Sequence, residues 1–475
     1  MDRLLEGVEL LDTSGALSET EVTSVEQDSG RVTPGALFFC VPGRHHDGHD
    51  FAPAAVEAGA VGLLVERPLA LGVAEARVPP GSMRPAMAQV ASAFYGHPAR
   101  SLLTVGVTGT NGKTTVTHLL GSIFEAHGLP TTVIGTLTGT RTTPEAPELQ
   151  RLLAMARDEG KQALSMEVSS HALTQGRVDG ITFAAAVFTN LSHEHLDHHG
   201  SMEAYFEAKA SLFRPDRALV GVVNADDPWG RRLLEQVTIP TVSFTTADAS
   251  AVHATRDDTS FTWHGRRVRL QLRGDYHVAN ALAAATTAHV LDIPDDAVVA
   301  GLEAAGPVPG RFEVVAADAP FTVVVDYAHT PDGLETALRS ARRLAQGGRV
   351  VCVFGCGGER DTAKRPAMGA VAQAGAHVVV VTSDNPRSED PLSIIEAVVS
   401  GMSPGAPVTV EPDRRTAIAL AVEAARPGDV VVIAGKGHED SIEIAGRRLP
   451  FDDRTEAAAA VDARRGAGHN TRTGP

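Results

Sequence analysis

A glycine-rich segment with one lysine is the part of the sequence best suited to bind phosphate. It reads Gly-Val-Thr-Gly-Thr-Asn-Gly-Lys-Thr-Thr from Gly106 to Thr115, after an apolar, β-branched run and before an amphipathic helix pattern. Glycines let backbone N–H groups approach phosphate oxygens, Lys113 supplies a positive charge, and the Thr114 hydroxyl can bind Mg²⁺. Val107 stands where the strict spacing has its first glycine, so we predict a variant phosphate loop. A strand-to-helix turn without ligand explains Gly-Lys-Thr at a helix start less well.

A carboxylate and a pair of cysteines are the other reactive groups in apolar runs. Glu167 lies near the end of the run from Ala163 to Val168, where a lone buried carboxylate would be costly. It therefore needs a cation or an ion-pair partner. Cys352 and Cys356 lie in and just after a later run, and without a second cysteine pair we interpret them as buried packing residues. Three cysteines in all form no disulfide framework and fit a reducing cytosol.

The elements that must position these groups alternate between strand and helix patterns. Around the loop, the patterns predict strands at Leu102–Thr108, Thr132–Ile134, Ala163–Val168, Ala184–Thr189 and Ala218–Val223, and a helix at Thr114–Ala126. After the Gly-Pro-Val-Pro-Gly linker of residues 306–310, strands follow at Thr322–Asp326, Val350–Phe354, Ala376–Val381 and Asp429–Ile433, with helices at Pro331–Ala345, Pro391–Val399 and Arg414–Ala425. Such alternation is typical of parallel sheets covered by helices on both faces.

Three α/β domains are therefore expected, which the length of 475 residues also favours. The weaker pattern before Ser101 predicts strands at Ala36–Val41 and Val61–Val65 around a helix near Ala52–Ala58. We predict a small N-terminal α/β domain (1–100), a central parallel-sheet ATPase domain with the phosphate loop (101–308), and a C-terminal Rossmann-like domain (309–463). Residues 464–475 lack large apolar side chains and are expected to form a disordered tail.

Composition narrows the classes of partner. A net charge of −16 argues against a nucleic-acid-binding surface but not against a small anionic ligand held by local groups. The acidic N-terminal segment, Met1 to Leu17, does not read as a signal peptide, and no run is apolar for long enough to span a bilayer. A cytoplasmic monomer without membrane insertion is the expectation.

Several further motifs make the sequence resemble the Mur ligases and the related folylpolyglutamate synthases. The loop Gly-Thr-Asn-Gly-Lys-Thr-Thr is similar to their ATP loop. The other matching segments are Thr142-Thr143-Pro144, Met166–His171, Thr189–Ser192 with His195–Asp197, Asp326–Asp332, Asp384–Arg387 and Gly435–Glu439. The last two point to the branch of the Mur family that adds the third residue of the peptidoglycan stem peptide. The similarity runs from about Thr20 to Asp453.

The resemblance implies an ATP- and Mg²⁺-dependent ligase that adds meso-diaminopimelate to UDP-N-acetylmuramoyl-L-alanyl-D-glutamate through an acyl-phosphate. It implies that Lys113, Glu167, His195 and Lys209 are catalytic, the last as a carbamate, and that Thr114, Glu167, His195 and carbamylated Lys209 hold Mg²⁺. From the sequence alone, Lys209 would by default be an exposed helix lysine. A structural ion pair is the weaker alternative for Glu167, and a surface position in the His-rich loop is the stronger competing alternative for His195. The implied ATP contacts are Gly109, Thr110, Asn111, Gly112, Lys113, Thr114, Thr115, Asn280, Arg311 and Asp326.

Substrate contacts are implied in the same way. Ser29, Arg44, His45 and His46 match positions that bind the UDP end, and Thr142, Thr143, Ser169, Gln175 and Arg177 match positions that hold the muramoyl-peptide. Arg360, Asp384, Asn385, Pro386, Arg387, Gly435 and Glu439 match positions that read the incoming amino acid. The Arg387 fork suits the distal carboxylate of diaminopimelate, whereas the ammonium of L-lysine would be repelled.

Departures from the family pattern leave alternatives open. The stretch Ser192–Gly200 is rich in histidine, Gly30 stands where an arginine is usual, and His277 replaces an asparagine. An L-lysine-adding enzyme, a ligase of specialised metabolism, a D-Ala-D-Ala-adding sibling and a folylpolyglutamate synthase share the chemistry. A P-loop ATPase or kinase is the alternative from another class.

Overall fold

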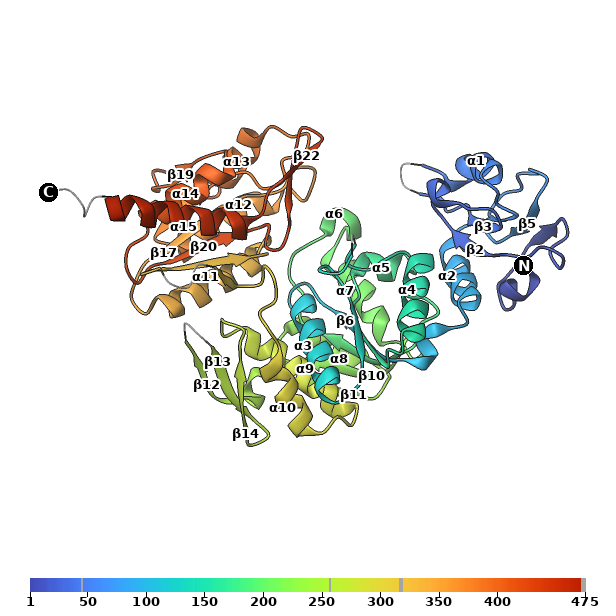
Figure 1. Cartoon of the computed structure of the whole chain (residues 1–475), viewed down its shortest axis with the longest axis horizontal. Coiled ribbons are helices and arrows are strands. Elements are labelled where there is room, and N and C mark those ends of the chain that lie inside the picture. Colours follow the sequence, from blue (N-terminus) through green and yellow to red (C-terminus); the bar gives the residue numbers. More distant parts are fainter. Residues whose placement is uncertain (44–45, 140, 256–257, 316–318, 471–475) are drawn as a thin grey trace.

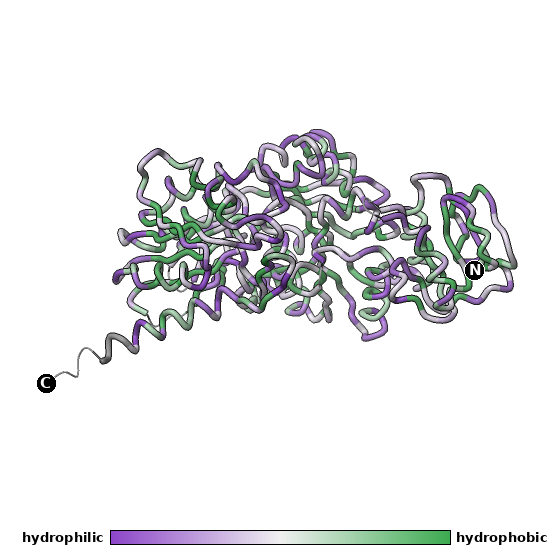
Figure 2. The backbone as a smooth tube through the Cα atoms, turned by 90° about the horizontal axis from the view of Figure 1, so that it is seen from above, coloured by the Kyte–Doolittle hydropathy of each residue, from purple (hydrophilic) through white to green (hydrophobic). Residues whose placement is uncertain are grey.

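The computed structural model describes residues 1–43, 46–139, 141–255, 258–315 and 319–470, and the side chains of these up to residue 466. Three sheet-centred units follow one another along an elongated molecule (Figure 1). The N-terminal unit lies at one end, the central unit in the middle and the C-terminal unit at the other end. Apolar segments run through the interior of each unit, with hydrophilic stretches between them (Figure 2).

The N-terminal unit is a five-stranded sheet in the order β1-β5-β4-β3-β2, parallel except for β1. Alternate residues of β3 pack on opposite faces, Leu37 and Phe39 against α2 and Phe38 towards α1. The elements are η1 (Asp2–Leu5), β1 (Asp12–Ser14), β2 (Ser24–Glu26), η2 (Ser29–Arg31), β3 (Ala36–Phe39), η3 (Gly48–Phe51), α1 (Ala52–Glu57), β4 (Gly62–Val65), β5 (Ala74–Arg77), α2 (Met83–Phe94) and η4 (Pro98–Ser101).

The central unit is a six-stranded parallel sheet in the order β11-β10-β9-β6-β8-β7. Apolar side chains cover both faces, so the strands are short aliphatic runs. The strands are β6 (Leu103–Thr108), β7 (Thr131–Ile134), β8 (Ala163–Glu167), β9 (Phe183–Phe188), β10 (Ala218–Asn224) and β11 (Thr241–Phe244). The helices are α3 (Lys113–Ala126), α4 (Ala146–Asp158), α5 (Ser170–Thr174), α6 (Leu196–His199), α7 (Met202–Ala210), α8 (Pro228–Gln236), α9 (His277–Val290) and α10 (Asp295–Ala304), with η5 (Ser211–Phe213) and η6 (Thr246–Asp248) between them.

The carboxyl ends of β6, β8 and β9 meet at one edge of this sheet, because the three strands are parallel neighbours. Helices start after β6 and β8, and the histidine-rich segment follows β9. Ligands of open α/β sheets bind at such an edge. This edge therefore gathers the phosphate loop, Glu167 and the segment around His195.

An antiparallel sheet that the sequence patterns did not predict is attached to the central unit. Its strands are β12 (Ser250–Ala254), β13 (Thr259–Trp263) and β14 (Arg266–Leu270). β14 alternates exposed arginines with buried Val268 and Leu270, which join the core shared with α9 and α10. The expectation of a mainly parallel architecture is correct for the main sheet. It did not include this three-stranded antiparallel sheet.

The C-terminal unit has the sheet order β15-β16-β20-β17-β18-β19, parallel except for β15. Its strands are β15 (Glu313–Val315), β16 (Thr322–Asp326), β17 (Val350–Phe354), β18 (Val378–Val381), β19 (Thr409–Val410) and β20 (Val430–Ala434), with a separate hairpin of β21 (Ser441–Ile444) and β22 (Arg447–Pro450). Its helices are α11 (Pro331–Ala345), α12 (Lys364–Gly375), α13 (Pro391–Val399), α14 (Arg414–Ala424) and α15 (Asp453–Asn470). Cys352 and Cys356 are free and buried here, as their interpretation as packing residues requires.

The prediction of a disordered tail from residue 464 is wrong for the residues up to 470, which continue helix α15. The Arg464 guanidinium donates hydrogen bonds to the carbonyls of Val422 and Ala425 and lies over the Phe321 ring. The aliphatic part of an arginine side chain can pack on an apolar surface, so this helix can continue although its sequence shows no large apolar residue. Residues 471–475 lie outside the described residues. No described helix is long and apolar enough to cross a membrane.

Candidate active site

The glycine-rich loop connects β6 to α3 and is fixed by its neighbour after β9. Gly109 and Gly112 have φ angles of 148° and 88°, which only glycine adopts without strain. A Cβ atom on Gly109 would collide with the Thr189 hydroxyl. The backbone N–H groups of Thr110 and Asn111 donate to the carbonyl and side-chain oxygens of Asn190, both at 2.9 Å. The N-terminus of α3 can accordingly receive an anion.

Two lysines converge on this loop. Lys113 Nζ donates to the carbonyls of Gly109 at 2.9 Å and Thr110 at 2.8 Å, and Lys209 Nζ donates to the same Gly109 carbonyl at 2.8 Å. Lys209 is 1% exposed, so its reading as an exposed helix lysine is wrong. Burial lowers the pKa of both amines, and for Lys209 the charge of Lys113 lowers the pKa further, well below its ordinary value.

Glu167 offers a carboxylate and His195 a neutral imidazole as possible metal ligands at the same edge of the central sheet. Glu167 is 1% exposed and accepts hydrogen bonds from the Thr136 backbone N–H at 2.8 Å and the Thr136 hydroxyl at 3.2 Å. No ion pair to Glu167 occurs among the described residues. Burial lowers the pKa of His195 to about 4 despite the nearby Glu194 carboxylate. The imidazole is therefore neutral at physiological pH, the form that binds metals.

The histidine-rich segment is packed together. His171 stacks on His198 with ring centroids 4.0 Å apart and lies edge-on to His195 at 4.9 Å. His199 Nε2 lies 2.9 Å from the Ser170 hydroxyl. Burial and the neighbouring rings lower the pKa of His171 to about 3. His193 and His198 are exposed, as expected of surface residues, whereas His195 and His199 are only partly exposed and pack beside His171.

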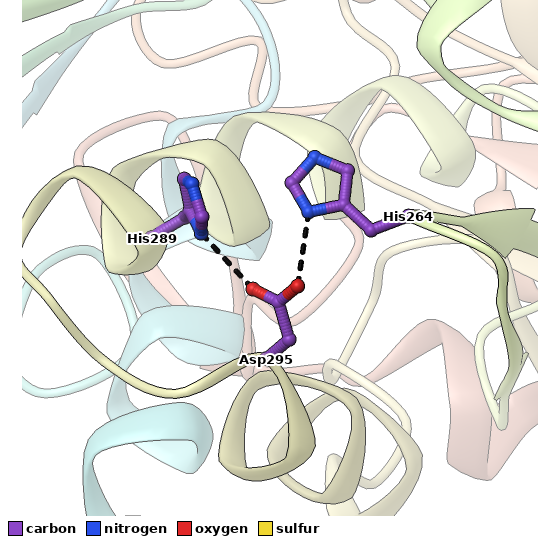
Figure 3. Close-up of side chains that lie close together, drawn as sticks. All are labelled: His264, His289 and Asp295. Carbon is purple, nitrogen blue, oxygen red and sulfur yellow. Dashed lines mark hydrogen bonds and ion pairs between the residues drawn. The ribbon is translucent and has the colours of Figure 1, made fainter.

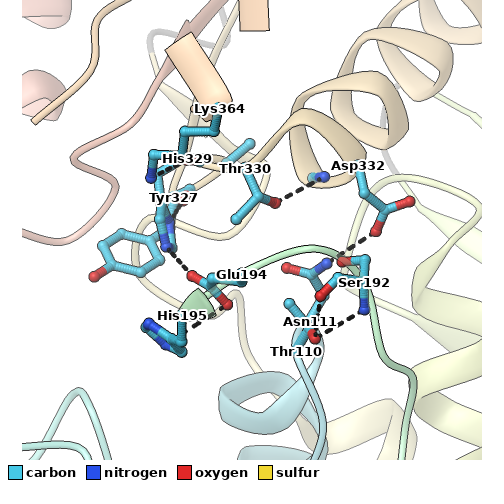
Figure 4. A network of polar contacts seen from close by, with 12 residues as sticks. Thr110, Asn111, Ser192, Glu194, His195, Tyr327, His329, Thr330, Asp332 and Lys364 are labelled. Atoms are coloured by element: carbon cyan, nitrogen blue, oxygen red, sulfur yellow. Dashed lines mark hydrogen bonds and ion pairs between the residues drawn. The ribbon is translucent and has the colours of Figure 1, made fainter. Parts of the chain in front are cut away.

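Side chains from the C-terminal unit reach across the cleft to the loop (Figure 4). His329 donates from Nε2 to Glu194 at 2.8 Å, and its Nδ1 lies 2.7 Å from the Tyr327 carbonyl. Both ring nitrogens thus face oxygen acceptors. Burial raises the pKa of Glu194, but the hydrogen bond and charge of His329 outweigh this and hold the pKa below its ordinary value. This ion pair joins the two units.

Two further contacts join the same units. Arg311 donates to the Thr114 hydroxyl at 2.9 Å while its guanidinium lies 4.4 Å from the centre of the Tyr327 ring. Asn111 Nδ2 donates to Asp332 at 3.0 Å. These contacts hold the C-terminal unit against the phosphate loop. Arg311 lies beside Thr114, where its guanidinium can approach a bound phosphate.

The first of two adjoining cavities, of about 370 Å³, lies between the central and C-terminal units. Its central-unit lining combines the phosphate loop, Glu167 and histidines, and its C-terminal lining combines four arginine or lysine side chains with three acidic ones. From the predicted sites it gathers Thr110, Asn111, Gly112, Lys113, Thr114, Thr142, Glu167, His195, Arg311, Arg360, Asp384, Asn385, Arg387, Gly435 and Glu439. The residues that complete the lining were assigned no role from the sequence, although several lie in the matching motifs: Thr136, His171, Glu194, Asp197, Tyr327, His329, Gly357, Asp361 and Lys364.

The adjoining cavity, of about 230 Å³, shares Asn111, Gly112, Thr114 and Arg311 with the first. It adds the predicted residues Thr115, Asn280 and Asp326, and Tyr276. Asp326 accepts backbone N–H groups from Phe312 at 2.7 Å and Ala328 at 2.8 Å, and burial raises its pKa. The two cavities together follow the loop from the α3 N-terminus towards α9.

The amino-acid side of the first cavity is organised by Lys436, which lies in the motif Gly435–Glu439 but was assigned no role from the sequence. Its fully buried ammonium lies 3.1 Å from Asn385 Oδ1 and 2.9 Å from Glu439, and 3.6 Å from Asp384. Asn385 Nδ2 also donates to Glu439 at 2.9 Å. Arg387 has a φ of 55° and its guanidinium donates to the Gly358 carbonyl, with Nε 3.5 Å from Glu443. The remaining N–H groups of Arg387 can reach an anion.

A third cavity, of about 700 Å³, lies between the N-terminal and central units. Of the residues matched to a UDP end, Ser29 lines it, and His46 is exposed and edge-on to Phe51, a lining residue. Arg44 and His45 lie outside the described residues. Four arginines line the same cavity and were missed, because they are scattered along the chain: Arg31, Arg84, Arg141 and Arg151.

Other predicted residues lie beside the cavities without lining them. Thr143 donates to the Glu167 carbonyl at 2.9 Å and accepts from the Ser169 N–H at 3.1 Å. Arg177 is already paired with Glu145 at 2.8 Å and with Gln175 at 2.7 Å. These residues buttress the segment that ends in Thr142. The described predicted residues absent from the three linings are His46, Gly109, Thr143, Ser169, Gln175, Arg177, Lys209 and Pro386.

Comparison with known proteins identifies related chains over almost the whole length. Residues 107–288 match the Mur ligase middle domain, residues 310–437 the Mur ligase glutamate ligase domain, and residues 21–99 the catalytic domain of the Mur ligase family. A curated relative from Synechococcus elongatus named UDP-N-acetylmuramoyl-L-alanyl-D-glutamate–2,6-diaminopimelate ligase is 43% identical, with 97% of this chain and 98% of the relative covered. A relative of the same name from Geobacillus kaustophilus is 45% identical, with 94% and 96% covered.

Solved structures give the same result for the fold. The structure of a protein with the same name has a TM-score of 0.63 and 34% identity over 94% of this chain and 95% of its own. A MurF ligase from Thermotoga maritima in complex with ADP has a TM-score of 0.66 at 19% identity, over 94% of this chain and 98% of its own, a likeness of fold alone. The predicted α/β fold and the resemblance stated from the motifs are both confirmed. The chain belongs to the Mur ligase family.

Proposed function

We propose that the chain is an ATP-dependent ligase that adds meso-diaminopimelate to UDP-N-acetylmuramoyl-L-alanyl-D-glutamate in peptidoglycan synthesis. The observation that carries the proposal is the first cavity, which joins a phosphate loop to a charged set suited to an amino acid. Relatives at 42–45% identity bear the name of this activity. Such a reaction takes place in the cytoplasm, and we expect a monomer.

ATP fits the two adjoining cavities with its phosphates at the α3 N-terminus. Lys113 and the loop N–H groups neutralise the phosphate charge, and Arg311 approaches it from the other unit. Gly109, Thr110, Asn111, Gly112, Thr114 and Thr115 form the cradle, while Asn280 and Asp326 line the part assigned to the nucleoside. Lys113 must leave its two carbonyl partners for the phosphate, which carries more negative charge.

The donor set at this edge fits Mg²⁺, because hydroxyl, carboxylate and imidazole groups face one region. Thr114, Glu167, His195 and the carbamate of Lys209 would hold it, and the ion would neutralise charge during phosphoryl transfer. Lys209 fits carbamylation chemically. Its lowered pKa leaves more of the amine neutral, and only the neutral nitrogen can attack CO₂ and release a proton.

The chemistry proceeds in two displacements. An oxygen of the D-glutamate carboxylate attacks the γ-phosphorus of ATP, ADP leaves, and an acyl-phosphate forms. The amine of diaminopimelate then attacks the acyl carbon, loses a proton, and expels inorganic phosphate that keeps the former carboxylate oxygen. Alignment and charge neutralisation supply most of the catalysis in such transfers.

The amino acid is assigned to the C-terminal side of the cavity. Its far carboxylate meets the Arg387 fork, while Asp384, Asn385 and Glu439, organised by Lys436, supply acceptors for an ammonium. Arg360 and Gly435 line the same region, and Pro386 sets the turn between Asn385 and Arg387. L-lysine would place an ammonium against the arginine, which disfavours it.

The UDP-sugar end is assigned to the third cavity, where Ser29, the neighbouring His46 and four arginines surround space for a diphosphate. Arg44 and His45 belong to the same assignment by family position. Thr142 lies at the first cavity, with Thr143, Ser169, Gln175 and Arg177 behind it on the path between the two cavities. We assign residues 1–100, 101–308 and 309–463 to acceptor binding, ATP binding and amino-acid binding.

The test is a product assay with ATP, the UDP-linked dipeptide and a panel of amino acids. The proposal predicts one new amide and one phosphate per turnover, with meso-diaminopimelate far ahead of L-lysine and no phosphate release when either substrate is omitted. Preferred use of L-lysine or D-Ala-D-Ala would replace the substrate assignment. Phosphate release without any amino acid would support an ATPase instead.

A further inference from the structure

Two histidines and one aspartate meet outside the cleft, on the central unit (Figure 3). Asp295 begins α10, His289 lies at the end of α9, and His264 lies in the turn between β13 and β14. Their three donor atoms all lie within 4.8 Å of one another. None of the three residues lines the cavities of the cleft, so the ligase chemistry makes no use of them.

Two of the donor-atom distances are already close to those of a metal site. Nδ1 of His264 lies 3.1 Å from Asp295 Oδ2, and Nδ1 of His289 lies 3.0 Å from Asp295 Oδ1. Ligands that surround a tetrahedral zinc ion at 2.0–2.1 Å stand roughly 3.3 Å from one another. The two histidine–carboxylate distances are therefore close to those of a tetrahedral site, and movement of the two histidine rings towards each other would complete one face of the tetrahedron.

The local backbone and packing hold His264 in place. His264 and Gly265 have φ angles of 47° and 73° between the paired residues Trp263 and Arg266, which is a two-residue turn with both central residues left-handed. Asparagine, aspartate or glycine is usual at the first of these positions, so histidine there is uncommon. The His264 ring also stacks on buried Trp263, with centroids 4.0 Å apart and planes at 14°.

We propose that His264, His289 and Asp295 form a binding site for a late first-row transition-metal ion, with Zn²⁺ as the best match. Two imidazoles and one carboxylate leave a fourth position to water, a donor set that favours zinc, nickel or copper over Mg²⁺. Both histidines are exposed, which gives an ion access from solvent. The bound ion clips the β13–β14 hairpin to the α9–α10 corner.

Zinc binding to the untagged full-length chain tests the proposal, because a histidine tag would bind the same ions. Calorimetry should detect a zinc site that millimolar Mg²⁺ does not compete with. The variants His264→Gln and His289→Gln should each weaken zinc binding by about tenfold or more, the range of losses seen when metal sites lose even supporting groups. His127→Gln, which removes an exposed histidine at the end of α3, is the matched control and should leave the affinity unchanged.

Tryptophan fluorescence supplies an independent readout. The chain has two tryptophans, so a Trp229→Phe background leaves Trp263 as the reporter beside the site. Cu²⁺ should quench this emission at concentrations that rise at least about tenfold in His264→Gln. Unchanged zinc affinity and quenching in the double variant His264→Gln/His289→Gln would overturn the proposal and assign the ion to the histidines near His171. Circular dichroism and ligase activity in zinc-free buffer check that the variants fold.

Discussion

Arg387 provides the sharpest test of how the C-terminal unit selects its amino acid. The side chain is 21% exposed, lines the first cavity and donates to the Gly358 carbonyl. Its remaining N–H groups can form two charge-assisted hydrogen bonds with the far carboxylate of diaminopimelate. Each such bond contributes about 1.5 kcal/mol or more, so Arg387→Ala should lose about 3 kcal/mol of binding, or roughly a hundredfold in kcat/KM.

The backbone adds no confounding strain in this experiment. Arg387 has a φ of 55°, and alanine tolerates this conformation about as poorly as arginine does. Arg387→Lys keeps the charge but loses the planar fork, and should fall between the wild type and the alanine variant. Arg447→Ala, an exposed arginine of β22, is the matched control.

Steady-state kinetics with diaminopimelate and ATP varied in turn measure both effects. The KM for diaminopimelate should rise about a hundredfold while the KM for ATP changes less than about twofold. The preference for diaminopimelate over L-lysine should shrink by the same factor. Equal losses for ATP and diaminopimelate, or a variant that keeps its preference over L-lysine, would refute the assignment of Arg387.

Three further predictions concern buried groups. Lys209→Ala should lower kcat by about a hundredfold or more, as removal of an electrostatic stabiliser does. ¹³CO₂ should give a carbamate NMR signal in the wild type that Lys209→Arg lacks. An equal signal in both proteins would contradict carbamylation of Lys209. His277 is fully buried and its pKa is lowered to about 3 by burial. As pH falls below about 6.5, the His277 imidazole takes up a proton in the unfolded chain but not in the folded one. Between pH 7 and 5, urea unfolding should therefore show the wild type losing about 2 kcal/mol more stability than His277→Asn. Equal losses of stability in the two proteins would refute the reasoning. Arg414 and Asp453 form a fully buried pair at 2.7 Å, so Arg414→Ala should cost about 3–5 kcal/mol in thermal or urea unfolding, whereas a loss below 1 kcal/mol would count against it.

Strands buried on both faces could be predicted closely from the sequence. Thr322–Asp326 and Val350–Phe354 match β16 and β17 residue for residue, because unbroken aliphatic runs have few other stable environments. The β12–β14 hairpin was missed because one face is solvated and its charged residues mask the alternation. Helix α12 was missed because Ala and Gly give it a weak apolar stripe.

The site was predictable where motifs lie within one segment and was not where partners come from distant segments. The loop from Gly109 to Thr115 could be identified from local spacing, and the set from Asp384 to Arg387 from its resemblance to a family motif. The ion pair of Glu194 with His329 joins residues 135 positions apart, and no local pattern reports it. Lys436 could have been found, since a lysine in Gly-Lys-Gly directly after a buried strand needs acceptors nearby.

The transfer of a carboxylate oxygen to phosphate tests the central chemistry most directly. The UDP-linked dipeptide is prepared with ¹⁸O in the D-glutamate carboxylate that reacts, and the phosphate released during amide formation is analysed by mass spectrometry. An acyl-phosphate route predicts one ¹⁸O atom in each phosphate, because the amine displaces phosphate together with the oxygen that attacked ATP. Phosphate that contains no ¹⁸O, formed at the same rate as the amide, would contradict the proposed mechanism.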